Sequence, residues 1–337
     1  MTKTTDSRFD ILKFILALLI LILHTTLYPE IFRPWVRSAV PVFFIISSYF
    51  FFRPVYASAY GSHGRFSHYV KRSVVLYFFW FAILIIPTCR IYHYFSAGVL
   101  EGLWKISFNI FFGGTFPASW FISACVIGIS IVYAARRHLR IMTVAALLCY
   151  LICCSLTNYF KLLPSFNEWF VHTFPIWNPA NSFPASLLWI CAGAIIARRE
   201  NEDKPLFRLP VNLVLMVAGF ILLWLEHRYI CANRWERTDD CYLSLIVVAP
   251  ALFMAILSLP GVSFSWTILL RHASVIIYCL HATIARLLFI HFKEVRILQP
   301  ESGVYNFAIT LLSVALASTL ILILQRRKFF SWLRFSY

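Results

Sequence analysis

Two side chains that could do chemistry lie inside the first hydrophobic segment of the chain. Lys13 and His24 fall in an apolar run, 9–28, where an ordinary membrane anchor would carry neither. On an α-helix, a separation of eleven residues places them within about 20° of one face and about 16 Å apart along the axis. A cation and a titratable imidazole in hydrocarbon are costly unless they face protein or a wet cavity. The spacing therefore predicts that both side chains face one functional path through the membrane.

A second histidine could meet the first. His281 lies in a late apolar segment, 273–292, about eight residues or about 12 Å from its start, near the middle of the bilayer. If the helices that carry His24 and His281 pack together, both imidazoles reach one cavity. Two other readings stay open. His281 could be a buried histidine that hydrogen-bonds to a neighbouring helix, and Lys13 could extend its long side chain to the inner interface.

A basic cluster precedes the third apolar segment. Arg65, Lys71 and Arg72 stand there with His63 and His68. Guanidinium and ammonium groups bind phosphate through charge and hydrogen bonds, so the cluster could hold a phosphorylated ligand. Basic residues also flank cytoplasmic helix ends for topological reasons, and position alone favours that second account.

The composition indicates which elements position these side chains. The 337 residues are 61% hydrophobic and 13% charged, whereas a typical soluble domain has about 25% charged residues. Apolar runs that can cross about 30 Å of hydrocarbon predict an all-α, polytopic integral membrane bundle of about ten transmembrane helices. The predicted spans are 9–28, 36–52, 73–89, 119–135, 141–156, 183–197, 211–226, 242–259, 273–292 and 305–324.

The net charge of +16 is distributed as a membrane topology rather than as a nucleic-acid surface. With the N-terminus inside, eighteen of the 30 Lys and Arg residues fall in inner segments and ten in outer loops. The positive-inside rule then places both termini in the cytoplasm. This alternation argues against nucleic acid as a partner and favours membrane lipids. The inner charge would also suit an anionic cytoplasmic substrate.

The chain is predicted to form a single membrane-embedded domain, 1–337, with no separate soluble domain, because its outer stretches are only loop-sized. It has no Gly-x-Ser-x-Gly elbow, no Gly-rich phosphate loop and no His-Glu-x-x-His zinc helix. Most of the 9 cysteines sit in or beside apolar spans as small hydrophobes, so no metal site is expected. Cys231 and Cys241 share one predicted outer loop, and a disulfide between them is a hypothesis that spacing alone cannot establish.

Several motifs, in order, resemble those of the acyltransferase-3 family of membrane proteins, which O-acylate surface glycans and related acceptors. The family opens with Phe-Asp-x-Leu-Arg and a His eleven residues after the Arg. Later helices carry Val-Pro-x-Phe-Phe-x-Ile-Ser-Gly-Tyr, a basic pair, a Trp-aromatic pair and Ser-x-x-Ile-Tyr-x-x-His. The matching residues are Phe9, Asp10, Leu12, His24, Val40, Pro41, Phe43, Phe44, Ile46, Ser47, Tyr49, Lys71, Arg72, Trp120, Phe121, Ser274, Ile277, Tyr278 and His281.

Three positions depart from the family pattern. Lys13 stands where the family has Arg, which keeps the charge but loses the planar bidentate geometry. Ser48 replaces a Gly and adds volume where helices approach closely. Val75 stands where many members have a second Arg after Arg72, so that basic site is incomplete.

The resemblance implies a membrane-bound O-acyltransferase of the bacterial inner membrane. Its donor would be acetyl-CoA or another acyl-CoA, used as a cytoplasmic substrate with no permanently bound cofactor. Its acceptor would be a hydroxyl of a cell-surface glycan, such as O-antigen, capsule or a lipid-linked precursor. Which sugar, which hydroxyl and which oligomeric state the protein has do not follow from the motifs.

The resemblance also implies roles for individual residues. His24 would act as general base on the attacking hydroxyl, or would carry the acyl group transiently as a nucleophile. Lys13 would neutralise the thioester oxyanion or a CoA phosphate, and His281 would orient His24 or the acceptor. The side chains expected to hold CoA phosphates are Arg72, Lys71 and Arg65.

Two other functions fit the same residues. A transporter or flippase for a glycan or a small anion would use His24 and Lys13 along a proton-coupled path. A non-catalytic membrane domain would bind its ligand without turnover. Transfer of label from acetyl-CoA separates the enzyme from both.

Overall fold

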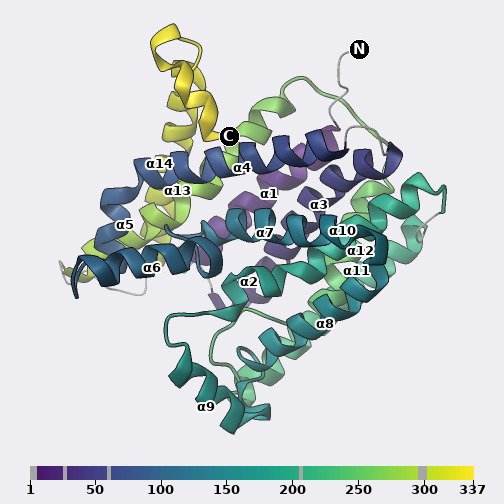
Figure 1. Cartoon of the computed structure of the whole chain (residues 1–337), viewed down its shortest axis with the longest axis horizontal. Coiled ribbons are helices and arrows are strands. Elements are labelled where there is room, and N and C mark those ends of the chain that lie inside the picture. Colours follow the sequence, from purple (N-terminus) through teal and green to yellow (C-terminus); the bar gives the residue numbers. More distant parts are fainter. Residues whose placement is uncertain (1–5, 26–28, 59–61, 205–207, 295–301) are drawn as a thin grey trace.

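The protein is a bundle of helices of very different lengths and tilts (Figure 1). The computed structural model describes residues 6–25, 29–58, 62–204, 208–294 and 302–337, and every regular element in these ranges is helical. The helices are α1 (Ser7–His24), α2 (Pro29–Val36), α3 (Ala39–Ala57), α4 (Ser62–Ile83), α5 (Ile85–Tyr92), α6 (Val99–Phe112), α7 (Trp120–Ala134), α8 (Leu139–Ser155), α9 (Pro164–Thr173), α10 (Phe183–Asn201), α11 (Leu209–Asn233), α12 (Leu245–Leu257), α13 (Thr267–Glu294) and α14 (Ser302–Leu324), with short 3-10 helices at η1 (Arg136–His138), η2 (Phe160–Leu162), η3 (Pro179–Asn181) and η4 (Lys328–Ser336).

Fewer helices than expected have the length and composition of a simple membrane span. Among the described residues, Arg33–Ala57, Arg136–Ser155, Leu209–Asn233, Thr267–His291 and Gly303–Leu324 qualify, and the bent pair α4 and α5 makes a sixth if it counts as one span. The helices α7 and α12 are apolar but shorter. The prediction of an all-α, multi-pass membrane protein is therefore confirmed, whereas the count of ten spans and the cytoplasmic termini stay predictions.

The third predicted span, 73–89, is broken. Its residues divide between α4 and α5, which meet at an angle of 74°. Pro87 accounts for the break, because its ring clashes with the carbonyl of the residue four positions earlier, Ile83, where α4 ends. The break turns the chain after α4 into a short helix of a different direction.

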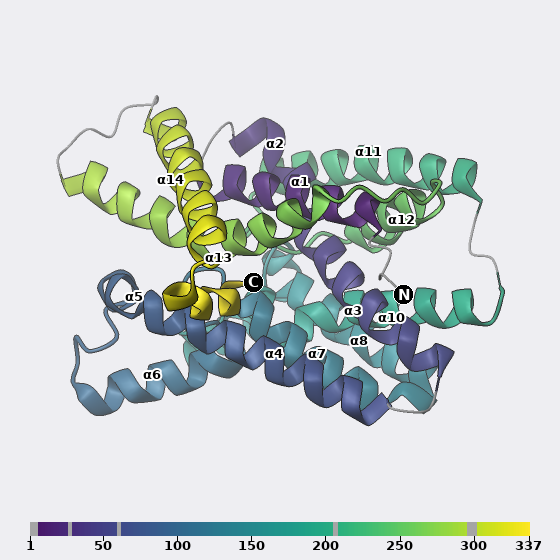
Figure 2. The same ribbon diagram turned by 90° about the horizontal axis from the view of Figure 1, so that it is seen from above.

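Helices α3 and α10 form the middle of the bundle. Seen from above, α1, α11, α12 and α13 lie on one side of them and α4 to α7 on the other (Figure 2). The two central helices cross closely, because a Cβ on Gly193 would overlap the Ser48 hydroxyl and lie 2.6 Å from the Ile45 carbonyl oxygen. Gly193 thus makes room for Ser48, which stands where the family has a glycine.

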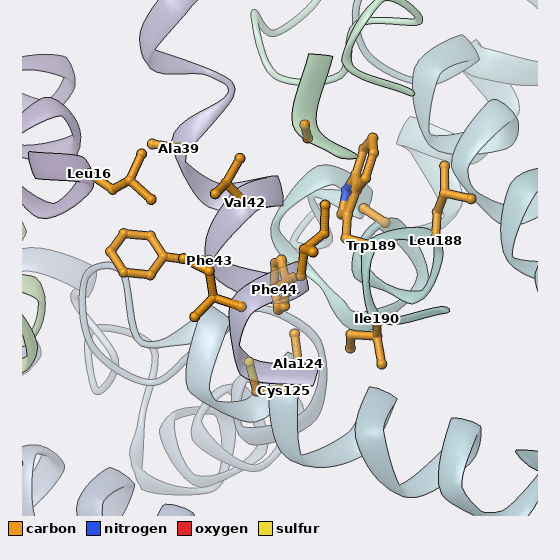
Figure 3. Packing of buried hydrophobic residues seen from close by; sticks show 14 of the residues in the cluster. Leu16, Ala39, Val42, Phe43, Phe44, Ala124, Cys125, Leu188, Trp189 and Ile190 are labelled. Atoms are coloured by element: carbon orange, nitrogen blue, oxygen red, sulfur yellow. The ribbon is translucent and has the colours of Figure 1, made fainter. Parts of the chain in front are cut away.

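Helix α3 shares its side chains between two neighbours. Phe43 lies on the side of Leu16 in α1, whereas Phe44 lies toward Trp189 in α10 (Figure 3). All four side chains are at most 8% exposed. These contacts hold α1 against the central pair, because close side-chain packing drives the association of helices in a membrane. Helix α1, which carries Lys13 and His24, also packs along α13, which carries His281.

Candidate active site

The structure brings the two intramembrane histidines together. The ring centroids of His24 and His281 lie 5.0 Å apart, with 59° between the ring planes. His281 is fully buried, and its Nδ1 donates to the carbonyl oxygen of Ile277, one turn earlier in α13, at 3.0 Å. Because a carbonyl can only accept, this bond fixes the proton on Nδ1. His281 Nε2 is buried and has no hydrogen-bond partner among the described residues, so its lone pair is available to a ligand or to His24.

A cavity of about 510 Å³ opens near the N-terminal end of α1. It is bounded by α1, α3, α4, α7 and α13, and we call it the donor cavity after the cytoplasmic donor that the family resemblance predicts. Its charged lining residues are Asp6, Asp10, Lys13, Arg72 and Arg271, and the remaining lining is mostly aromatic and aliphatic. The Lys13 ammonium lies 5.4 Å from the centre of the Phe50 ring, a cation–π distance. Lys13 therefore faces this cavity and does not simply extend to the membrane surface.

An ion pair joins the two helices that carry the histidines. Arg271 on α13 makes two hydrogen bonds to Asp10 on α1, Nε to Oδ1 and Nη2 to Oδ2, each 2.7 Å long. The Asp10 carboxylate is almost completely buried, and Thr267 lies 3.5 Å from it. The bidentate geometry sets the register of α1 against α13, and thereby the approach of His24 to His281.

Sequence reasoning missed the role of Arg271, which the positive-inside count had assigned to topology. The available signal was Asp10 itself. A carboxylate among apolar residues needs a cation beside it, and Arg271 precedes the second histidine by ten residues, as Asp10 precedes the first by fourteen.

The predicted phosphate-binding residues separate in the structure. Arg72 lines the donor cavity from α4. Lys71 is exposed and does not line it. Arg65 is exposed as well, and its guanidinium donates to the Pro54 carbonyl oxygen at the end of α3. Of the three, the structure places only Arg72 beside Lys13 and Arg271.

Three aromatic rings form the inner wall of the donor cavity. Phe43, Phe121 and Tyr278 come from α3, α7 and α13, and their ring centroids lie 5.3 to 6.2 Å apart. Neither histidine lines the cavity, but the Tyr278 ring lies 5.8 Å from that of His281. The Tyr278 hydroxyl donates to the Ala118 carbonyl oxygen at 2.6 Å. Ala118 has φ +66°, a conformation that costs a non-glycine residue free energy, so this loop is held by its surroundings.

A smaller cavity of about 60 Å³ lies next to Leu23, the residue before His24 in α1. Its lining includes Trp120 and Trp189 and the ion pair of Arg37 with Asp240, whose Nη1 and Oδ1 are 2.7 Å apart. Such a volume holds a few water molecules or the hydroxyl-bearing edge of a larger ligand. Indole rings beside paired charges are a surface that binds polar, hydroxyl-rich groups.

The cysteines of the predicted outer loop lie in separate surroundings. Both Cys231 and Cys241 are free thiols in the structure, so the proposed disulfide between them is not formed. Cys231 is exposed on α11, with its Sγ 3.7 Å from His227 Nδ1. Cys241 is buried and contacts Cys154. The α-helical turn places Cys231 beside His227, four residues earlier, and the loop after α11 folds Cys241 inward. Among the described residues, no group of three or more His, Cys, Asp or Glu side chains is arranged to hold a metal ion.

Comparison with known proteins gives one match. A family model described as an acyltransferase domain matches residues 6–324. No curated protein and no solved structure matches the chain. The matched range includes Lys13, His24, Arg72, Arg271 and His281.

Proposed function

The chain belongs to the acyltransferase-3 family of multi-pass membrane acyltransferases, and on this premise we propose that it moves an acetyl or other short acyl group from cytoplasmic acyl-CoA to a hydroxyl of a cell-surface glycan. The acceptor class that we propose is O-antigen, capsule or a lipid-linked precursor, in the bacterial inner membrane. One observation carries the proposal: a cavity with three cationic side chains ends one tyrosine ring away from the buried His281, whose ring lies 5.0 Å from that of His24.

The donor cavity suits a ligand that is anionic at one end and neutral at the other. Lys13 and Arg72 have no described carboxylate within ion-pair distance, so both can meet a phosphate. Arg271 is already engaged by Asp10 and acts mainly as a positioning residue. The apolar rings deeper in the cavity would contact the uncharged arm of acyl-CoA and its acyl group.

The position of Lys13 along α1 favours one of the two roles expected for it, which are neutralising the thioester oxyanion and binding a CoA phosphate. Eleven residues of helix put its backbone about 16 Å from that of His24, and the wall of Phe43, Phe121 and Tyr278 borders the cavity on the histidine side. An oxyanion at His24 needs a donor within about 3 Å. We therefore assign Lys13 to a phosphate of the donor and not to the oxyanion.

The histidines would then move the proton. His24 takes the proton of the acceptor hydroxyl as that oxygen attacks the thioester carbonyl carbon, and the protonated imidazole returns it to the sulfur as the carbon–sulfur bond breaks. The products are an ester and free CoA. A general base of this kind contributes about 10²–10⁴-fold to the rate. His281, with its proton fixed on Nδ1, offers Nε2 as an acceptor that orients His24 or the hydroxyl.

The acceptor would enter from the opposite side. The small cavity beside Leu23 has room for one hydroxyl-bearing edge of a sugar, with Trp120 and Trp189 as apolar faces and Arg37 and Asp240 as hydrogen-bonding groups. The donor must cross the aromatic wall, so Tyr278 has to leave its bond to Ala118 during the reaction. Donor and acceptor would meet at His24 from two separate openings.

A transfer assay tests the proposal. The purified protein in detergent receives acetyl-CoA labelled on the acetyl group and a surface-glycan acceptor, and we expect label in the glycan. His24→Ala should lower the rate of this transfer by about 10²–10⁴-fold, whereas His172→Ala, which removes an exposed histidine of α9, should leave it unchanged. Transfer at the wild-type rate in His24→Ala would contradict the assigned base, and glycan movement across vesicles without labelling would favour a transporter.

Rapid-quench experiments distinguish the two forms of catalysis by His24. A covalent carrier predicts label bound to the protein in the absence of acceptor, which His24→Ala removes. A general base predicts no labelled protein under the same conditions.

A further inference from the structure

A second charged cavity lies away from the donor cavity, and we propose that it binds the phosphate headgroup of an anionic membrane phospholipid. It occupies about 670 Å³ between the start of α8 and the end of α10 and shares no lining residue with the donor cavity. We call it the basic groove. Its lining residues are Arg137, His138, Leu139, Arg140, Ile141, Ile195, Arg198, Arg199, Glu202 and Lys204.

The charged side chains that line the groove are mostly positive. Five lining residues are Lys or Arg and one is a carboxylate. Glu202 accepts from Arg198 Nε at 2.8 Å and from Lys204 Nζ at 3.1 Å, and these bonds hold the pKa of Glu202 below its usual range. No described carboxylate lies within ion-pair distance of Arg137, Arg140 or Arg199. The protein therefore leaves three guanidinium groups at one concave surface for an outside anion.

The positive-inside rule explains why basic residues stand at these helix ends, but it does not explain the cavity. Topology alone is satisfied by side chains that point separately into water. Here two segments sixty residues apart, η1 with the start of α8 and the end of α10, line one hollow with exposed Arg side chains. Guanidinium groups around a hollow can surround a phosphate from several sides, each with two parallel hydrogen bonds.

The surface next to the groove identifies the source of the phosphate as a lipid. Helix α8 is a candidate membrane span of which only 28% is buried. Starting at the groove, its outer face exposes Ile141, Val144 and Leu148, which are 70%, 60% and 56% exposed. Their spacing of three and four residues puts them on one stripe along the helix. A phospholipid whose headgroup sits in the groove would lay an acyl chain along this stripe, as basic hollows between spanning helices bind anionic headgroups.

The donor cavity differs from the basic groove in its balance of charge and in where its apolar lining lies. Its two carboxylates stand against three cations, and its apolar lining is inside the bundle instead of on the lipid-facing surface. A headgroup with an outward chain therefore fits the basic groove, and a soluble thioester with an inward acyl group fits the donor cavity. The lipid site does not depend on the acyl-transfer proposal.

The test compares two triple variants that remove the same charge. The first is Arg137→Gln, Arg140→Gln and Arg199→Gln. The matched control is Arg326→Gln, Arg327→Gln and Lys328→Gln, which lie together after α14 and are also exposed. Tail-labelled phosphatidylglycerol in detergent micelles is titrated against each protein, and energy transfer from tryptophan reports binding. Phosphatidylcholine with the same tail and label is the neutral reference.

We expect the groove variant to bind phosphatidylglycerol about a hundredfold more weakly than the wild type, because each of the three guanidinium groups around one headgroup contributes about fivefold, whereas the control residues line no part of the groove. The control variant should bind within about twofold of the wild type, and phosphatidylcholine should bind all three proteins equally weakly. Equal binding of phosphatidylglycerol by both variants overturns the proposal. Displacement of the lipid by millimolar inorganic phosphate or by CoA would overturn the assignment to a lipid and give the groove to a soluble phosphate.

Discussion

The donor cavity and the histidine pair are neighbours with opposite chemistry. The cavity carries five charged side chains and is open, whereas His281 is completely buried and, among the described residues, bonds only to the backbone of its own helix. One layer of aromatic rings, Phe43, Phe121 and Tyr278, stands between them. On the proposed mechanism, the charges that would bind the donor are thus kept apart from the imidazoles that would move the proton. A dry, ring-lined site also strengthens each hydrogen bond made there.

Substitution of His24 tests most strongly whether the donor cavity and the histidine pair have separate roles. We expect His24→Ala to lower kcat by about 10²–10⁴-fold and to leave the KM for acyl-CoA unchanged, because His24 lies outside the donor cavity. Steady-state rates with acetyl-CoA as the varied substrate measure both constants. A large rise in KM with little change in kcat would mean that His24 binds the donor, and that the two regions are one.

The ion pair between Asp10 and Arg271 lines the donor cavity and also joins the two helices that carry the histidines, so it affects both regions. Asp10→Asn removes one partner of a buried pair, a change that costs about 3–5 kcal/mol when both groups are fully buried and less here because Arg271 is 36% exposed. We expect about 1–3 kcal/mol of lost stability and a loss of activity through the misplacement of α1 against α13. Thermal unfolding in detergent gives the first quantity and the transfer assay the second. Full stability in the variant would show that the helices are held in register by their apolar contacts alone.

Lys13 lines the donor cavity, and neither histidine does. We expect Lys13→Ala to raise the KM for acyl-CoA about tenfold and to lose most of the activity at low donor concentration, whereas Lys13→Arg keeps the charge and the activity. The same assay over a range of acyl-CoA concentrations separates KM from kcat. If Lys13→Ala loses kcat at saturating donor, the assignment of Lys13 to a phosphate is wrong. An alanine variant with unchanged constants would reduce Lys13 to a residue that only extends toward the interface.

Substitution of Tyr278 tests whether the aromatic wall of the donor cavity limits the size of the acyl group. Tyr278→Ala opens space at the acyl end of the cavity, so we expect propionyl-CoA to gain on acetyl-CoA by about fourfold, the value of one buried methylene. Tyr278→Phe keeps the ring and loses only the bond to the Ala118 carbonyl, so it should keep the wild-type preference. The ratio of kcat/KM for the two donors is the measurement. An unchanged ratio in Tyr278→Ala would mean that the acyl group does not pass this ring.

Some of the site followed from residue spacing and depth. The separation of Lys13 and His24 gave one helical face, and the depth of His281 allowed it to meet His24. The structure brings the two rings into contact. The depth of each histidine in its helix follows from helix geometry, and the packing of α1 on α13 brings the two rings together. The shared path expected for Lys13 and His24 stays a prediction, because Lys13 lines the donor cavity and His24 does not.

Other features were not visible in the chain. Lys71 and Arg72 are adjacent in sequence, yet only Arg72 lines the cavity, because neighbouring residues on a helix point about 100° apart. Apolar composition also does not reveal a break such as the 74° bend between α4 and α5, so the count of ten spans stays a prediction. The two cysteines of the predicted loop are separated as well, because Cys231 lies exposed on α11 and Cys241 is buried in the loop that follows it.

The sequence by itself determined that this is a helical membrane protein of the acyltransferase-3 family, because hydrophobicity, basic flanks and short motifs are local properties of the chain. Only the tertiary structure decided which of its charges form one site. Asp10 and Arg271 are 261 residues apart, and the groove residues near Arg137 and Arg199 are about sixty apart. Such pairs meet through the packing of whole helices. This packing depends on side-chain shape along both partners, so no single segment of the sequence predicts it.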